Sequence, residues 1–201
     1  MNVFLRLGAY ILHPLFIPLF GACLYYSLSP RYWESELVGI KLIAIAIVSV
    51  CIPMVTFFLL KNLGLVQSIH LRTVVERKFP LLVQCLLLLL LLKTVLDAFE
   101  NPALYYFFVG MLFSSLTALL LVLFKIKVSL HQMGISGLTL FVLALSIYFK
   151  VNLLFWVGLF VFCNGWVASS RLHTASHNGR ELVAGFFTGS VPQLLMLAYW
   201  L

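Results

Sequence analysis

The stretch "ALYYFFVGMLFSSLTALLLVLF", residues 103–124, decides the fold class because it contains no charged side chain over its whole length. A membrane-spanning helix needs roughly 20 consecutive apolar residues. The complete chain has 201 residues, of which 63% are hydrophobic and 9% are charged. Soluble domains usually contain about 25% charged residues. The sequence therefore predicts an all-α, polytopic integral membrane protein.

Further apolar stretches of similar length predict a helical bundle of about six to seven spans. With 103–124, the candidates are Phe4–Tyr25, Leu37–Leu60, Phe79–Leu96, Leu130–Phe149, Val151–Ala168 and Ala184–Leu201. Prolines 14 and 18 predict a kink in the first span, and Pro192 interrupts the last. We expect one integral membrane domain over residues 1–201, with N-terminal spans in 1–60 and a core in 61–189.

Composition also limits the partners and cofactors. The four cysteines lie far apart within apolar runs, which is typical of small buried side chains rather than of disulfides or a metal site. The net charge of +7 reflects the usual excess of basic residues beside membrane spans. We therefore expect the bilayer and its lipids as partners, and no nucleic acid.

Three polar segments interrupt the apolar pattern at residues 67–80, 127–134 and 170–185. Two predicted spans separate each segment from the next, so all three return to the same membrane surface. They carry basic groups (Arg72, Arg77, Lys78, Arg171), hydroxyls (Ser129, Ser170) and histidines (His131, His173, His177). Arginine guanidinium groups bind phosphate oxygens bidentately, so the segments predict an anion site.

The histidines in these segments favour phosphoryl transfer. His177 and Glu181 are four residues apart, so on a helix they share a face. Glu181 can accept the proton of one ring nitrogen and leave the other free to attack phosphorus. His131 is then a candidate acid for the leaving oxygen, because an ordinary histidine has a pKa of about 6.5.

The stretch "SRLHTASHNGRE" resembles the third signature of the phosphatidic acid phosphatase type 2 superfamily, which reads S-R, five residues, H, three residues, D. Ser170, Arg171 and His177 match it, and Glu181 stands where the family has aspartate. "VSLH" is similar to the second signature, P-S-G-H, through Ser129 and His131.

The first family signature, K, six residues, R-P, is matched less well. When the signature is aligned on Pro80, Arg72 matches its lysine and Phe79 stands where it has arginine. Arg77 and Lys78 lie one or two residues before Phe79. The resemblance covers roughly residues 67–189.

The resemblance implies a membrane hydrolase that removes phosphate from a lipid phosphate or pyrophosphate and needs no metal or other cofactor. It implies that His177 is the nucleophile that forms a phosphohistidine, that Glu181 orients it, and that His131 is the general acid. The phosphate-binding residues it implies are Arg72, Ser129 and Arg171, with Arg77 or Lys78 as substitutes for the missing arginine.

Two other interpretations remain open. Val128, Leu130, Phe79 and Glu181 depart from the family pattern, so a catalytically inactive protein that binds phospholipid headgroups is the alternative function. His173, His177 and Glu181 would also form one stripe of a helix with spacing suited to a transition metal. For Lys125, Lys127 and Arg180 we expect a role as membrane anchors.

Overall fold

Helices form wherever the sequence is apolar over several turns. The computed structural model describes residues 3–65 and 73–201, and these contain no strand. The helices are α1 (Val3–Ile11), α2 (Ile17–Leu28), α3 (Ser35–Ala46), α4 (Ile52–Asn62), α5 (Lys78–Thr94), α6 (Pro102–Leu123), α7 (Leu130–Phe149), α8 (Leu154–His173) and α9 (Gly179–Leu197). A π-helical turn, Ile47–Cys51, joins α3 to α4.

Four of these segments are long and apolar enough to cross a membrane: Val3–Leu28, Ser35–Asn62, Pro102–Leu123 and Leu130–Phe149. The all-α class expected from composition is confirmed for the described residues. Helix α5 is shorter than these four segments, and α8 and α9 have a lower mean hydropathy, so these three do not meet the same conditions for a membrane span.

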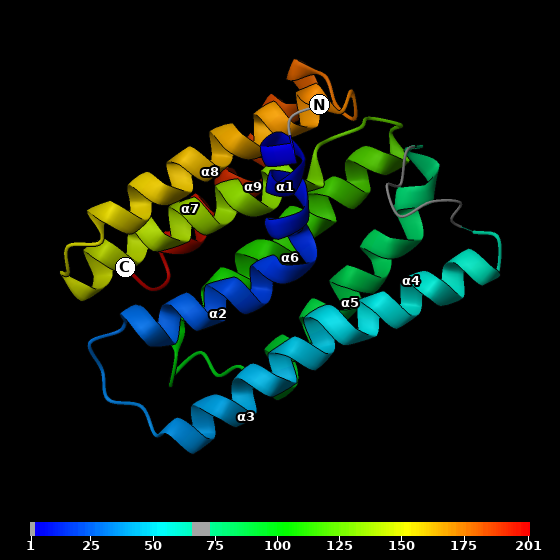
Figure 1. Cartoon of the computed structure of the whole chain (residues 1–201). Helices are drawn as coiled ribbons and strands as arrows, with labels where there is room; N and C mark the ends of the chain where they lie inside the picture. The colour runs from blue at the N-terminus through cyan, green and yellow to red at the C-terminus, as the bar shows by residue number, and fades with distance from the viewer. Residues whose placement is uncertain (1–2, 66–72) are drawn as a thin grey trace.

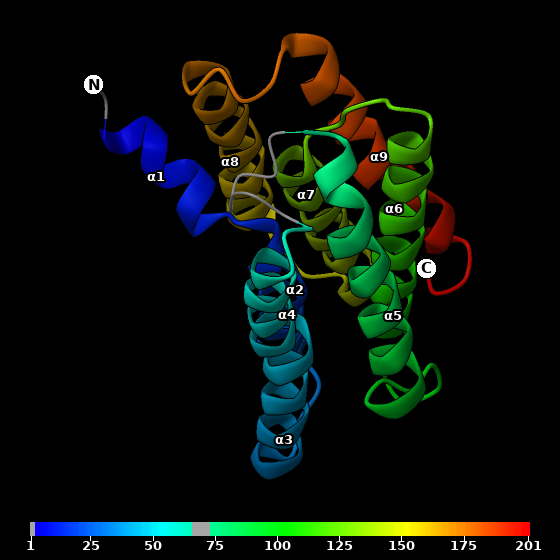
Figure 2. The same cartoon turned by 90° about the vertical axis from the view of Figure 1, so that its right-hand side faces the viewer.

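Helix α7 lies inside the bundle, where it packs against α8 and α9, and α6 packs against α5 and α9 (Figure 1). The stacked rings of Phe107 and Phe141, with centroids 4.1 Å apart, join α6 to α7 in the core. The long α3–α4 segment lies at the side of the bundle, next to α2 and α5 (Figure 2).

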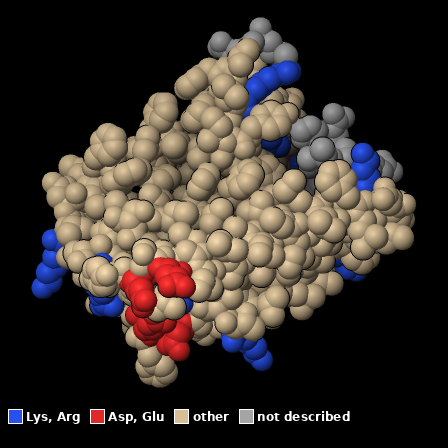
Figure 3. All heavy atoms as spheres, turned by 60° about the horizontal axis from the view of Figure 1, so that its bottom comes forward, with Lys and Arg blue, Asp and Glu red and all other residues tan. Residues whose placement is uncertain are grey.

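Acidic side chains gather at the end where the α2–α3 and α5–α6 loops lie, and there Lys41 contacts Glu100 at 2.6 Å (Figure 3).

Prolines have different effects in the first and last helices. The predicted kink in the first span is confirmed, because α1 ends at Ile11 and a 3₁₀ turn starts at Pro14. The expected interruption at Pro192 is wrong, since α9 continues through it to Leu197. Pro192 is buried, and packing of α9 against α6 and α7 outweighs the one hydrogen bond that proline removes.

Two glycines allow α9 to approach α7 closely. A Cβ atom on Gly185 would lie 2.6 Å from the carbonyl oxygen of Ser129, and one on Gly189 would collide with the carbonyl oxygen of Met133. Ser136 donates a hydrogen bond to the carbonyl of Phe186 across the same contact, at 3.0 Å. The contact sets the register between the start of α7 and the second and third turns of α9.

We expect Gly189→Ala to destabilise the protein by about 1–3 kcal/mol, because the added methyl group must push two backbones apart. The matched control is Gly165→Ala on α8, where a Cβ atom would have no neighbour among the described residues within 4 Å. Thermal unfolding of the detergent-solubilised protein measures both. Equal unfolding temperatures for the two variants would contradict the account.

Candidate functional site

The helices α5, α7 and α9 begin at the same end of the bundle, where α8 ends (Figure 2). Two hydrogen bonds join the polar segments there. Nη1 of Arg77 donates to the carbonyl of Val128 at 2.7 Å, and Nζ of Lys127 donates to the carbonyl of Ser176 at 2.7 Å. The structure therefore brings the described parts of all three segments together, as the even number of crossings predicts.

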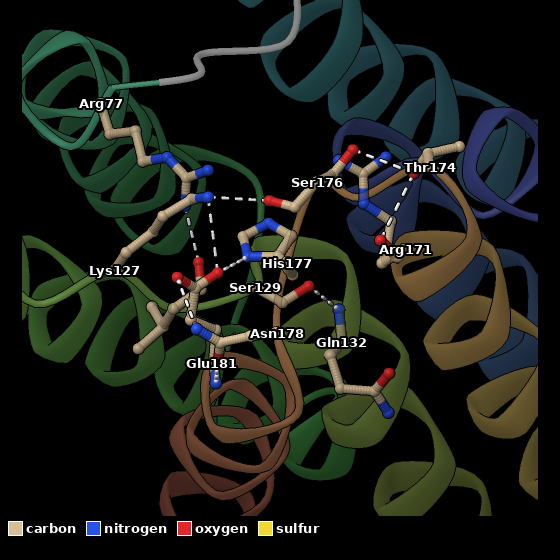
Figure 4. A network of polar contacts seen from close by, with 11 residues as sticks. Arg77, Lys127, Ser129, Gln132, Arg171, Thr174, Ser176, His177, Asn178 and Glu181 are labelled. Atoms are coloured by element: carbon tan, nitrogen blue, oxygen red, sulfur yellow. Dashed lines mark hydrogen bonds and ion pairs between the residues drawn. The ribbon is translucent and has the colours of Figure 1, made fainter.

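The histidine–glutamate pair forms at the start of α9. Nδ1 of His177 and Oε2 of Glu181 are 2.6 Å apart (Figure 4). The predicted shared helix face is wrong, because α8 has ended and His177 lies in the loop before Asn178, the N-cap of α9. The Asn178 side chain accepts a hydrogen bond from the Glu181 backbone at 2.9 Å, which fixes the turn that brings the pair together.

This pairing leaves the second ring nitrogen of His177 available. Because the carboxylate accepts a hydrogen bond from Nδ1–H, the neutral ring carries its free electron pair on Nε2. Among the contacts of residues 3–65 and 73–201, Nε2 has no hydrogen-bond partner. Burial lowers the pKa of His177 to about 4; the hydrogen bond with Glu181 opposes this shift, and the nearby cations Arg77, Lys127 and Arg171 add to it.

Three cations surround this histidine. In Figure 4 His177 lies between Arg77 and Lys127 on one side and Arg171 on the other. Both arginines are buried, and within the described part of the chain Nε of Arg171 has no hydrogen-bond partner. Nζ of Lys127 is 3.4 Å from Oε2 of Glu181. A buried cation with unused N–H groups is costly, and a bound anion would offset that cost.

The other expected phosphate ligands are placed differently. Lys78 is exposed at the start of α5, whereas its neighbour Arg77 is buried and faces the site. The hydroxyl of Ser129 accepts a hydrogen bond from the Gln132 backbone at 3.4 Å and so caps α7. Ser129 also donates its backbone N–H to the carbonyl of Glu181 at 3.1 Å. Arg72 lies outside the described residues.

His131 is anchored to the first helix. Its Nε2 lies 3.1 Å from the carbonyl oxygen of Ala9 in α1, and its ring meets the ring of His13 edge-on at 5.0 Å. It lines the same cavity as His177. With Nε2 on the carbonyl of Ala9, Nδ1 is the nitrogen of His131 left for a reacting group.

Lys127 is the site residue that sequence reasoning missed. We expected it to be a membrane anchor, but its ammonium group contacts both the carboxylate of Glu181 and the carbonyl of Ser176. The only signal in the sequence is its position two residues before Ser129. Its partner Glu181 is far away along the chain, and the α7–α9 contact brings them together.

The site occupies the polar end of a cavity of about 1160 Å³. Arg77, Lys127, Arg171 and both site histidines line one part of it, and apolar side chains of α4 such as Phe57 and Phe58 line another. Binding pockets for small ligands commonly measure about 300–1,000 Å³, so this cavity admits a large amphipathic molecule.

The helical metal stripe considered above does not form. His173 is the last residue of α8, His177 lies in the loop and Glu181 lies in α9, so the three do not share one helix. Within residues 3–65 and 73–201, no three histidine, cysteine or acidic side chains are grouped as metal ligands would be.

Comparisons with protein-family models, curated proteins and solved structures found no match for this chain. The geometry of the site itself therefore carries the functional argument.

The low pKa of His177 can be tested by ¹⁵N nuclear magnetic resonance of histidine-labelled protein in micelles. An ordinary histidine is half protonated at about pH 6.5. Because burial favours the neutral form, His177 should remain neutral, with its proton on Nδ1, at pH 6.5 and titrate only as the pH falls toward about 4. A midpoint at or above 6.5 would contradict this electrostatic picture.

Proposed function

We propose that the protein is a membrane phosphatase or phosphotransferase of the phosphatidic acid phosphatase type 2 kind, acting on a lipid-linked phosphate or pyrophosphate. One observation carries the proposal: His177 bonds Glu181 through Nδ1, its Nε2 has no hydrogen-bond partner within the described residues, and the cations Arg77, Lys127 and Arg171 lie near its ring. A nucleophilic nitrogen beside converging cations is what an attack on a phosphoryl group requires.

The reaction would proceed in two displacements. Nε2 of His177 attacks phosphorus, the bond between phosphorus and the lipid oxygen breaks, and the leaving oxygen takes a proton from His131. Glu181 stabilises the positive charge that develops on the His177 ring. Water, or another acceptor hydroxyl, then attacks the phosphohistidine and gives its proton to Nδ1 of His131. The bond between Nε2 and phosphorus breaks, and inorganic phosphate or a new phosphate ester leaves.

His131 would act in its doubly protonated form, which the negative charge of a bound phosphate favours. Nε2–H stays hydrogen-bonded to the carbonyl of Ala9, and this bond holds the ring in place. The proton on Nδ1 is transferred to the leaving oxygen. Arg77, Lys127 and Arg171 would neutralise the phosphoryl oxygens, and Arg72 joins them as a proposed ligand from the sequence pattern.

For the membrane arrangement we infer seven spans in one integral domain. Besides the four long apolar segments, α5, α8 and α9 are each packed in the same bundle and run between the same two ends. Helix α5 is short, with 17 residues, and polar residues at the site end lower the hydropathy of α8 and α9. The site then lies near one membrane surface, with its cavity leading into the bilayer.

A second function, binding of phospholipid headgroups without catalysis, is favoured by one observation. The Ser129 hydroxyl caps α7 and Nε2 of His131 bonds the carbonyl of Ala9, so two residues with roles implied by the resemblance also make structural contacts. In that case the cations would hold a phosphate that His177 never attacks.

The test is phosphate release by the purified protein from a panel of diacylglycerol phosphates, sphingoid phosphates and polyisoprenyl phosphates and pyrophosphates. We expect release from at least one of them, and a loss of at least 10³-fold in His177→Asn, because no other described group replaces the nucleophile. Tight phosphate-dependent binding without any release would support the headgroup-binding function instead.

Lys127 gives a second prediction. Lys127→Met removes the cation that contacts Glu181 and the His177 loop, and we expect kcat/KM for phosphate release to fall about 10- to 100-fold. Lys125→Met is the matched control, because Lys125 is exposed in the same segment. An equal effect of the two substitutions would show that Lys127 is only a membrane anchor.

A further inference from the structure

Polar side chains lie deep in the cavity, away from the cations. Gln84 of α5, Ser115 of α6 and Gln193 of α9 line it within otherwise apolar helices. Polar groups within a membrane bundle are costly unless they have a partner, and they often mark a binding site.

These side chains have unused hydrogen-bonding groups. Ser114 donates to the carbonyl of Gly110 at 2.9 Å, as serines in helices commonly do, whereas Ser115 beside it makes no hydrogen bond within the described residues. The amide of Gln84 likewise has no partner there. Gln193 donates from Nε2 to the carbonyl of Phe107 at 3.0 Å, and its Oε1 accepts no hydrogen bond from the described residues.

Gln84 and Ser115 lie at a similar depth below the phosphate site. Leu81 and Ala118 pack together with Val128 directly beneath it. Gln84 is one helical turn beyond Leu81, and Ser115 is one turn beyond Ala118, because α5 and α6 run in opposite directions. Gln84 follows Arg77 by about 10 Å along α5, and helical side chains lean toward the N-terminus, which brings its amide nearer to the cations.

We propose that Gln84 and Ser115, with Gln193 deeper in the cavity, bind the acyl linkage of the lipid phosphate, an ester or amide whose carbonyl accepts from the Gln84 amide and the Ser115 hydroxyl. This selects acylated lipid phosphates over polyisoprenyl phosphates, whose hydrocarbon chains offer no acceptor. The inference rests on the proposed lipid-phosphate site and adds the substrate class.

Gln193 fits the same ligand class. Its free Oε1 can accept a hydrogen bond from a hydroxyl or amide N–H further along the lipid. The α4 side chains Phe57 and Phe58, which line the same cavity, provide an apolar wall for the acyl chains. A purely hydrocarbon ligand would leave the groups of Gln84 and Ser115 without partners, at a cost in binding.

The test measures binding rather than turnover, using non-hydrolysable phosphonates of two matched lipids in nanodiscs: a diacylglycerol phosphonate and its dialkyl ether analogue. The two have the same chains and differ in the carbonyl groups. We expect the diacyl lipid to bind about tenfold more tightly to the wild-type protein, as two hydrogen bonds of ordinary strength predict.

The preference should fall to about twofold or less in Ser115→Ala and in Gln84→Met. The control Ser114→Ala should retain it, because the Ser114 hydroxyl is already bonded to Gly110. Equal binding of the two lipids by the wild type, or a preference that survives both substitutions, overturns the inference. Preserved ester preference in a protein that releases phosphate from no lipid supports the subsite and rejects the phosphatase.

Discussion

The close contact between α7 and α9 is the constraint on which the site depends. Gly185 and Gly189 let the α9 backbone approach Ser129 and Met133 of α7 to a distance that any side chain would prevent. This packing lets the backbone N–H of Ser129 donate a hydrogen bond to the carbonyl of Glu181. The segment before α7 and the loop before α9 are thereby held together, and their side chains can form one site.

The electrostatics of the site follow from that register. Lys127 reaches Glu181 and the His177 loop only because α7 and α9 begin side by side. Glu181 keeps the proton of His177 on Nδ1, while burial and three nearby cations disfavour a second proton. The arrangement maintains a neutral, correctly oriented imidazole where an anion would bind, which is the condition for nucleophilic attack on phosphate.

The sequence predicts much of this structure because membrane helices and motif spacing are local properties. The kink at Pro14 and the helical class follow from composition and from proline chemistry. The spacing predicts the His177–Glu181 pair through a shared helix face, whereas in the structure a turn capped by Asn178 brings the two side chains together. Spacing alone cannot distinguish these, since both bring residues four apart into contact.

Other features depend on tertiary packing that single-sequence reasoning does not reach. Arg77 and Lys78 are adjacent and chemically similar, and only the 3₁₀ turn before α5 decides that Arg77 is buried and Lys78 exposed. The contact of His131 with Ala9 joins the first helix to the seventh. The role of Lys127 depends on the register of α7 against α9, which glycine positions set.

The central claim is that His177 carries the phosphoryl group, and trapping that intermediate tests it most directly. The protein is mixed with a lipid phosphate labelled with ³²P, quenched in alkali to preserve phosphohistidine, and the label on the denatured chain is located by peptide mapping. We predict alkali-stable, acid-labile label on His177 and none in His177→Asn. Phosphate release without label on the chain, or label on another residue, would contradict it.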